Sequence, residues 1–259
     1  MRTSGNTILI TGGGSGIGEA LAHRFQDLGN RVIIAGRRLD ALEQAAARRE
    51  GITPMVLDVE DPVAIAEFAR RVAAEHPGLN VLINNAGIMR LEKLDRARDL
   101  ADAEATVTTN LLGPIRLIDA LIDHLREQSD PAIVNLTSGL AFVPLIATPT
   151  YSATKAALHA YTVALREALR GQVEVIELAP PAVQTELTPG QSQRPGYQPL
   201  DEFIDQVMAL FQQQPTPREI LVERVKFLRN AEAEGRFDET LRQINETVER
   251  ARAAQPEPA

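Results

Sequence analysis

Tyr151 and Lys155 stand at positions i and i+4 in the segment YSATK, downstream of Ser138. On a helix such residues share one face, with Cβ atoms about 5–6 Å apart. A tyrosine has an ordinary pKa of about 10, and a neighbouring cation favours the phenolate and lowers that value. The pattern predicts a phenol that exchanges a proton with a substrate oxygen, to which Ser138 donates a hydrogen bond. Because this spacing is common on helices, and because a lone Ser138 reads as a strand-end cap, the prediction depends on the preceding elements.

A glycine-rich turn, TGGGSGIG at residues 11–18, lies between an apolar strand-like run and a helical segment. Gly12, Gly16 and Gly18 allow positive φ values and close approach of a ligand to the backbone. The helix N-terminus beyond them offers free N–H groups to a pyrophosphate. Its place in the first βα unit favours a dinucleotide site. A glycine-rich turn without a ligand is the alternative.

The end of the second strand bears on the choice of cofactor. An acidic residue there would bind the ribose 2′-hydroxyl of NAD, but Gly36 stands in that place and is followed by Arg37 and Arg38. A guanidinium pairs bidentately with a phosphate. The residues therefore predict NADP (NADPH), with NAD less favoured. Arginines that only face solvent are the alternative.

Apolar strands alternate with helical segments through the first 180 residues. The predicted strands are 8–10, 32–35, 55–59, 81–84, 132–138 and 173–178, and a long helix is predicted over about 98–126. Continuous apolar strands separated by helices indicate a parallel sheet covered on both faces. The fold class is α/β, a Rossmann-type doubly wound parallel sheet in a single domain.

The chain changes character after Pro180. Residues 184–217 are rich in Gln, Pro and Gly and are predicted to form a mobile substrate lid, with a short helix over 201–211 and with Tyr197 and Phe203. A helical C-terminal extension follows, with charged helices at about 218–234 and 238–253. The core of the domain is predicted over about 5–185.

Composition excludes several classes of function. The net charge of −8 and the pI of about 5.2 argue against a nucleic-acid partner. No apolar run reaches the roughly 18 residues of a membrane helix, and a signal peptide is not expected, so a cytoplasmic location is predicted. With no cysteine and no metal-ligand spacing among the four histidines, no metal site is predicted. His159 is interpreted as a packing or surface residue.

The motifs together resemble the classical short-chain dehydrogenases/reductases (SDR family) over about residues 5–185. The matching features are TGGGSGIG, NNAG at residues 84–87, Asn110, Ser138 and Tyr151-x-x-x-Lys155. The resemblance implies a nicotinamide cofactor and hydride transfer at a C–OH/C=O centre. The segments 179–187 and 220–237 resemble the DltE-like branch, which does not identify a substrate.

The resemblance assigns catalytic roles residue by residue. Tyr151 exchanges the proton, Lys155 lowers its pKa and binds the nicotinamide ribose, and Ser138 polarises the carbonyl. Asn110 holds a water in a proton relay with the lysine. The implied cofactor contacts, with the two arginines argued above, are Gly12, Ser15, Gly16, Ile17, Gly18, Arg37, Arg38, Asp58, Val59, Asn85, Ala86, Gly87, Tyr151, Lys155, Pro181, Val183 and Thr185.

The chain departs from the family pattern in two places. Pro181 follows Pro180 where the family usually has glycine, which stiffens the nicotinamide wall and removes a backbone donor. The usual C-terminal strand with its Asp-Gly-Gly ending is absent. In many members that region builds a tetramer face, so a homodimer through the helices at about 98–126 and 150–170 is expected instead.

The predicted function is reversible, NADP(H)-dependent reduction of an aldehyde or ketone. Between Ser138 and Tyr151 the side chains of Leu140, Phe142, Val143, Leu145 and Ile146 are apolar, which favours an uncharged, apolar substrate. Packing beneath the lid is the alternative for some of them. Two other functions remain open. One is a non-catalytic NADP-binding protein that regulates or binds partners, and the other is an epimerase or dehydratase on the same fold.

Overall fold

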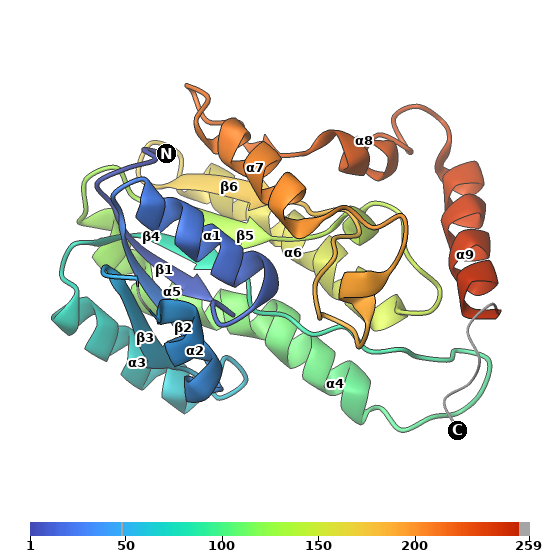
Figure 1. The fold of residues 1–259 in the computed structure, drawn as a ribbon, viewed down its shortest axis with the longest axis horizontal. Helices are drawn as coiled ribbons and strands as arrows, with labels where there is room; N and C mark the ends of the chain where they lie inside the picture. The colour runs from blue at the N-terminus through green and yellow to red at the C-terminus, as the bar shows by residue number, and fades with distance from the viewer. Residues whose placement is uncertain (48, 254–259) are drawn as a thin grey trace.

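A parallel seven-stranded sheet forms the centre of the protein (Figure 1). The structure, a computed structural model, describes residues 1–47 and 49–253. The strands are β1 (Thr7–Thr11), β2 (Arg31–Gly36), β3 (Ile52–Val56), β4 (Leu79–Asn84), β5 (Ala132–Leu136), β6 (Glu174–Leu178) and β7 (Glu219–Ile220). Their order is β3-β2-β1-β4-β5-β6-β7. The Rossmann-type prediction is confirmed, and the strand order reverses between β1 and β4, where such sheets bind dinucleotides.

Helices cover both faces of the sheet (Figure 1). They are α1 (Gly16–Asp27), α2 (Leu39–Ala46), α3 (Pro62–Glu75), α4 (Ala101–Val107), α5 (Gly113–Arg126), α6 (Pro149–Ala168), α7 (Leu200–Phe211), α8 (Glu223–Arg229) and α9 (Phe237–Ala253). One core cluster joins the sheet to α1, α2 and α7, and a second joins it to α3, α5 and the end of α6. Among the described helices, none has both the length and the apolar character needed to cross a membrane.

Several predicted boundaries were wrong; the fifth strand, for example, ends at Leu136 rather than at residue 138. The third strand is β3, which ends at Val56 rather than residue 59, so Asp58 and Val59 follow it. It begins earlier because the pairing with β2 starts at Ile52, and Pro54 is tolerated because β3 is an edge strand. The long helix predicted over 98–126 is interrupted: α4 passes through a π-helical turn, η1 (Thr108–Leu112), into α5.

The C-terminal region also differs from the prediction. The structure does contain a seventh strand. β7 has only two residues and pairs in parallel with β6 at the edge of the sheet. The predicted short helix is α7. Its Phe203 is fully buried and Phe211 packs edge-on against Phe25 of α1, with ring centroids 5.5 Å apart. Phe203 therefore belongs to the core and does not face a substrate.

Candidate active site

Helix α6 carries the Tyr–Lys pair on its buried side. Tyr151 is 7% and Lys155 4% exposed, and the Lys155 Nζ lies 5.6 Å from the centroid of the tyrosine ring. The ammonium donates a 2.8 Å hydrogen bond to the main-chain oxygen of Leu136, the last residue of β5. The helix is thus tied to the strand end that leads to Ser138.

Ser138 begins a short 3₁₀ turn, η2 (Gly139–Ala141), just after β5. Its Oγ accepts a 3.1 Å hydrogen bond from the Leu140 N–H, which is the local capping role considered for this residue. The hydroxyl proton stays available for another acceptor, because capping uses only the oxygen lone pair. Ser138 also lines a cavity, so the capping and catalytic roles are compatible.

Asn110 lies in the π-helical turn η1 and is fully buried. Its side chain accepts from the Ile88 N–H at 2.8 Å and donates to the Ile88 oxygen at 2.8 Å and to Thr154 at 3.3 Å. A Cβ built on Gly87 would lie 3.2 Å from Asn110 Oδ1 and 3.7 Å from Lys155 Nζ, so glycine keeps this approach open. Asn110 therefore holds the segment after NNAG; its proton relay stays a prediction.

Burial shifts the pKa values of both Tyr151 and Lys155. It raises the pKa of Tyr151 to about 12, while the Ser138 hydroxyl acts in the opposite direction. Burial lowers the pKa of Lys155 to about 8. The expectation that the lysine pulls the tyrosine pKa below its ordinary value is thus wrong for this structure, because desolvation of the phenolate dominates. At neutral pH the site holds a protonated phenol and an ammonium, which is a proton-donating state.

A groove of about 540 Å³ runs along the carboxyl ends of the central strands. Most of the predicted cofactor contacts line it, namely Gly12, Ser15, Gly16, Ile17, Arg37, Arg38, Asn85, Ala86, Gly87, Lys155 and Thr185. Segments far apart in the sequence therefore converge on one elongated site. A dinucleotide has the length and the phosphate charge that suit such a groove.

The glycine turn fits a pyrophosphate. Gly12 and Gly16 adopt positive φ values of 66° and 57°, which place the turn close to the groove. Ser15 is the N-cap of α1 but makes no side-chain capping hydrogen bond, so the first N–H groups of the helix are not satisfied by its side chain. A Cβ on Gly18 would lie 2.4 Å from Gly12 O, so this glycine serves close packing instead.

Other predicted cofactor residues lie away from the groove lining. The Asp58 carboxylate accepts from the Glu60 N–H at 3.0 Å and closes a local turn, and Val59 packs against the core. Val183 is buried and bridges to Gln198. Pro181, with Tyr197, lines the neighbouring cavity rather than the groove.

One residue that supports the groove was not predicted. The Thr11 hydroxyl accepts hydrogen bonds from the N–H groups of Asn85 and Ala86, each at 3.1 Å, and the Asn85 side chain donates back to Thr11 and Gly12 oxygens. Thr11 thereby fastens β1 to the NNAG segment. Its place directly before the glycine turn was the available signal.

Arg37 lies at the groove with its side chain about half exposed. Its Nη1 pairs with Glu60 Oε1 at 3.2 Å, and Glu60 is also held by the Thr109 hydroxyl at 2.8 Å. Arg38 is the N-cap of α2. Both arginines line the groove, and the contact with Glu60 uses Nη1 of Arg37 and leaves its other N–H donors for a phosphate.

A second cavity, of about 280 Å³, adjoins the groove and shares Leu187 with it. None of the described residues that line it is charged. They are Met89, Ser138, Gly139, Leu140, Leu145, Pro180, Pro181, Ala182, Leu187, Gln191, Tyr197, Phe227, Leu228, Gln243, Ile244, Thr247 and Val248. Of the five apolar residues predicted to face a substrate, only Leu140 and Leu145 line this cavity. Val143 is fully buried and Ile146 is exposed.

The parallel sheet and the groove at the carboxyl ends of its central strands define a Rossmann-type class of protein. A family model for short chain dehydrogenases matches residues 6–196, and the chain belongs to the short-chain dehydrogenase family. It is therefore an oxidoreductase of that family.

Individual relatives agree with this assignment. The chain is 38% identical over 251 residues to the uncharacterized oxidoreductase DltE of Bacillus subtilis (strain 168), covering 95% of this chain and 98% of the relative. A short chain dehydrogenase from Burkholderia cenocepacia J2315 in complex with NADP has a TM-score of 0.77 at 25% identity, covering 99% and 100% of the two chains. An alcohol dehydrogenase from Thermococcus sibiricus complexed with 5-hydroxy-NADP has a TM-score of 0.75 at 26% identity, covering 84% and 95%. The DltE-like resemblance is confirmed.

Proposed function

We propose that the protein reduces an uncharged, apolar aldehyde or ketone with NADPH, reversibly, as a carbonyl reductase. The observation that carries the proposal is the position of the Tyr–Lys pair. Lys155 lines the cofactor groove and Ser138 lines the apolar cavity, and Tyr151 is buried one turn before Lys155 on the same helix, α6. A carbonyl carbon at this junction lies beside both a hydride source and a proton donor.

The residues divide the work as follows. When bound, NADPH supplies a hydride to the carbonyl carbon. Ser138 donates a hydrogen bond that polarises the carbonyl, and Tyr151 gives its proton to the developing alkoxide. Lys155, an ammonium below about pH 8, stabilises the phenolate that remains. Acid–base help of this kind contributes about 10²–10⁴-fold in rate.

The preference for NADPH over NADH rests on Arg37 and Arg38, which line the groove where a 2′-phosphate would lie. The Burkholderia and Thermococcus relatives are described with NADP and 5-hydroxy-NADP, which supports this choice. The uncharged lining of the cavity supports an apolar substrate, because a carboxylate or phosphate there would lose its hydration without a cationic partner.

The test is NADPH oxidation across a panel of aldehydes and ketones, with neutral apolar compounds matched against carboxylate-bearing compounds of equal size. The proposal predicts turnover of neutral members and a kcat/KM at least about tenfold lower for their charged counterparts. NADPH binding without oxidation of any member would favour the non-catalytic alternative. Conversion of a substrate with no net change in NADPH would favour an epimerase or dehydratase.

A further inference from the structure

A row of four polar side chains, three of them buried, crosses the sheet. Asn84 of β4, Asn135 of β5, Glu177 of β6 and Glu219 of β7 are register partners from strand to strand. Register partners point to the same face. The first three are 3%, 0% and 0% exposed. Central strands of parallel sheets are ordinarily apolar on both faces, so a continuous polar row needs a reason.

Two members of the row bind the helix that carries the Tyr–Lys pair. The Asn135 side chain donates a 3.0 Å hydrogen bond to the Thr162 hydroxyl of α6. Its oxygen accepts a 2.9 Å hydrogen bond from Asn84. Glu177 accepts from Thr137 at 2.6 Å and pairs with His159 Nδ1 of α6 at 2.8 Å. His159 and Thr162 lie three residues apart on one side of α6, so two neighbouring strands hold the same helix face.

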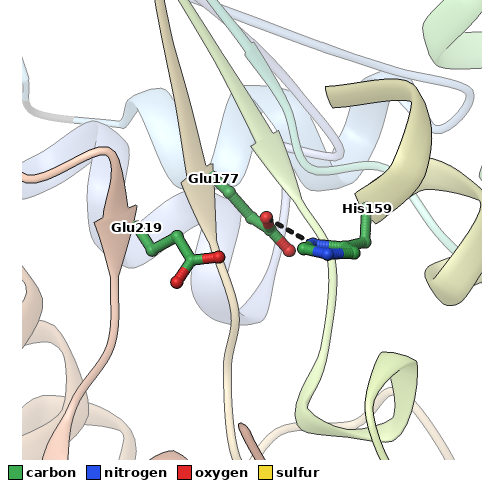
Figure 2. Close-up of side chains that lie close together, drawn as sticks. All are labelled: His159, Glu177 and Glu219. Atoms are coloured by element: carbon green, nitrogen blue, oxygen red, sulfur yellow. Dashed lines mark hydrogen bonds and ion pairs between the residues drawn. The ribbon is translucent and has the colours of Figure 1, made fainter. Parts of the chain in front are cut away.

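The row continues to the edge of the sheet. Figure 2 shows His159, Glu177 and Glu219 side by side, with the imidazole meeting Glu177. Glu219 is held by the Arg229 guanidinium of α8 at 3.1 Å, and this guanidinium also lies 4.8 Å from the centroid of the Phe142 ring. Two carboxylates on adjacent strands would repel each other, and the imidazole and guanidinium offset that repulsion.

The three side chains in Figure 2 have the chemistry of metal ligands, with ligand atoms within 4.8 Å of one another. The sequence spacing did not predict this cluster. The carboxylate oxygens of this cluster, however, already have hydrogen-bond partners. Thr137 and His159 satisfy the two oxygens of Glu177, and Arg229 binds both oxygens of Glu219. A cation would have to displace a bound guanidinium, so the contacts favour a structural network.

We propose that His159 and Glu177 are positioning residues that fix the placement of α6, and with it Tyr151 and Lys155, on the sheet. Apolar packing alone tolerates small slips along a helix, whereas buried hydrogen bonds require one alignment, because a slip leaves polar groups unpaired. Lys155 lies one helical turn from His159, and Tyr151 lies two turns away, so a slip at His159 moves both. Misplacement by about 1 Å costs up to 10²-fold in rate.

This inference rests on the proposed function for its kinetic readout. His159→Leu removes the contact with Glu177 and is expected to lower kcat by about 10–100-fold. KM and the NADPH dissociation constant should stay within about twofold. His159→Gln keeps an N–H that can donate to Glu177 and should restore most of kcat. Unchanged kcat in His159→Leu, at temperatures where it is folded, would overturn the proposal.

A matched control separates positioning from general destabilisation. Asn80 is buried on β4 and bonds to Asn6 at 3.0 Å, at the amino end of the strand, away from α6. Asn80→Ala should lower the melting temperature as His159→Leu does but leave kcat unchanged. An equal kcat loss in both variants would mean that stability alone explains the effect, and the proposal would be wrong.

Two further measurements do not depend on turnover. In a crystal structure of His159→Leu with NADPH, the Tyr151 side chain should be displaced relative to Ser138; an unmoved α6 contradicts the proposal even if no carbonyl substrate exists. Zn²⁺ or Mn²⁺ added to the wild type should leave the melting temperature unchanged. A rise that His159→Leu abolishes would instead identify a metal site and overturn the positioning role.

Discussion

Lys155 donates a 2.8 Å hydrogen bond to the main-chain oxygen of Leu136, two residues before Ser138 in the chain. This contact joins the two elements of the site. Lys155 and Tyr151 both lie on α6, and Leu136 is the last residue of β5, just before Ser138. The contact also compensates a lysine that is almost fully removed from water. The same burial makes the charge of the lysine sensitive to pH near neutrality.

The rate of reduction should therefore fall as the pH rises through about 8. Burial lowers the pKa of Lys155 to about 8, so above that pH the ammonium that stabilises the phenolate of Tyr151 is lost. Tyr151, with a pKa of about 12, stays protonated over this pH range, so its titration does not add a second change in the rate. The measurement is kcat/KM for carbonyl reduction between about pH 6 and 10. A rate that rises with pH would contradict this role for Lys155.

Arg37→Ala should weaken NADPH binding by about 10-fold or more and NADH binding by less than about twofold. A charge-assisted hydrogen bond to a phosphate is worth about 1.5–3 kcal/mol, and only NADPH carries the 2′-phosphate. Arg49→Ala is the control, since Arg49 pairs with Asp27 at 2.8 Å and does not line the groove. Fluorescence titration of both nucleotides measures the effect, and equal losses for the two would rule out the phosphate contact.

Local signals in the sequence were enough to predict many of the residues that line the groove. The glycine turn, the arginines after β2 and the NNAG segment are each contiguous, and strand order places them on one groove. The role of Thr11 was not predicted, because its hydroxyl binds the NNAG segment, which lies far along the chain. Asp58 was predicted to lie in the third strand, whereas β3 ends at Val56 and the carboxylate closes a local turn; its contact with the cofactor stays a prediction.

The residues that surround the apolar cavity were harder to predict, because tertiary packing brings them together. Phe203 looked like a lid residue in a Pro- and Gln-rich stretch, yet it lies on the apolar face of α7 in the core. Strand β7 has only two residues, one of them Glu219, and so lacks an apolar run. His159 could not be linked to Glu177 by spacing, since only the packing of α6 on β6 brings them together.

Helix α9 supplies a wall of the apolar cavity, and Asn245 fastens it there. The Asn245 side chain accepts from the Ile146 N–H at 2.7 Å and donates to the Pro144 oxygen at 3.3 Å. Asn245→Ala should raise KM for bulky apolar carbonyl compounds by about tenfold, because loss of these bonds, each worth about 0.5–1.5 kcal/mol, frees the wall. NADPH affinity should not change.

Glu246→Ala provides the matched control for Asn245. Glu246 is on the same helix, pairs with Arg250 at 2.9 Å and does not line the cavity. Steady-state kinetics with one small and one bulky ketone distinguish the two variants. An equal rise in KM for both ketones and both variants would show that the cavity beneath α9 is not where the substrate binds.

In the proposed reaction, the Tyr151 phenol delivers the proton during NADPH-dependent carbonyl reduction. The most direct test of this step is Tyr151→Phe, which removes one oxygen atom while keeping the buried ring, assayed with the best neutral ketone or aldehyde of the panel. We expect kcat to fall by about 10²–10⁴-fold while the NADPH dissociation constant stays within about twofold. Turnover by Tyr151→Phe at the wild-type rate would contradict this role.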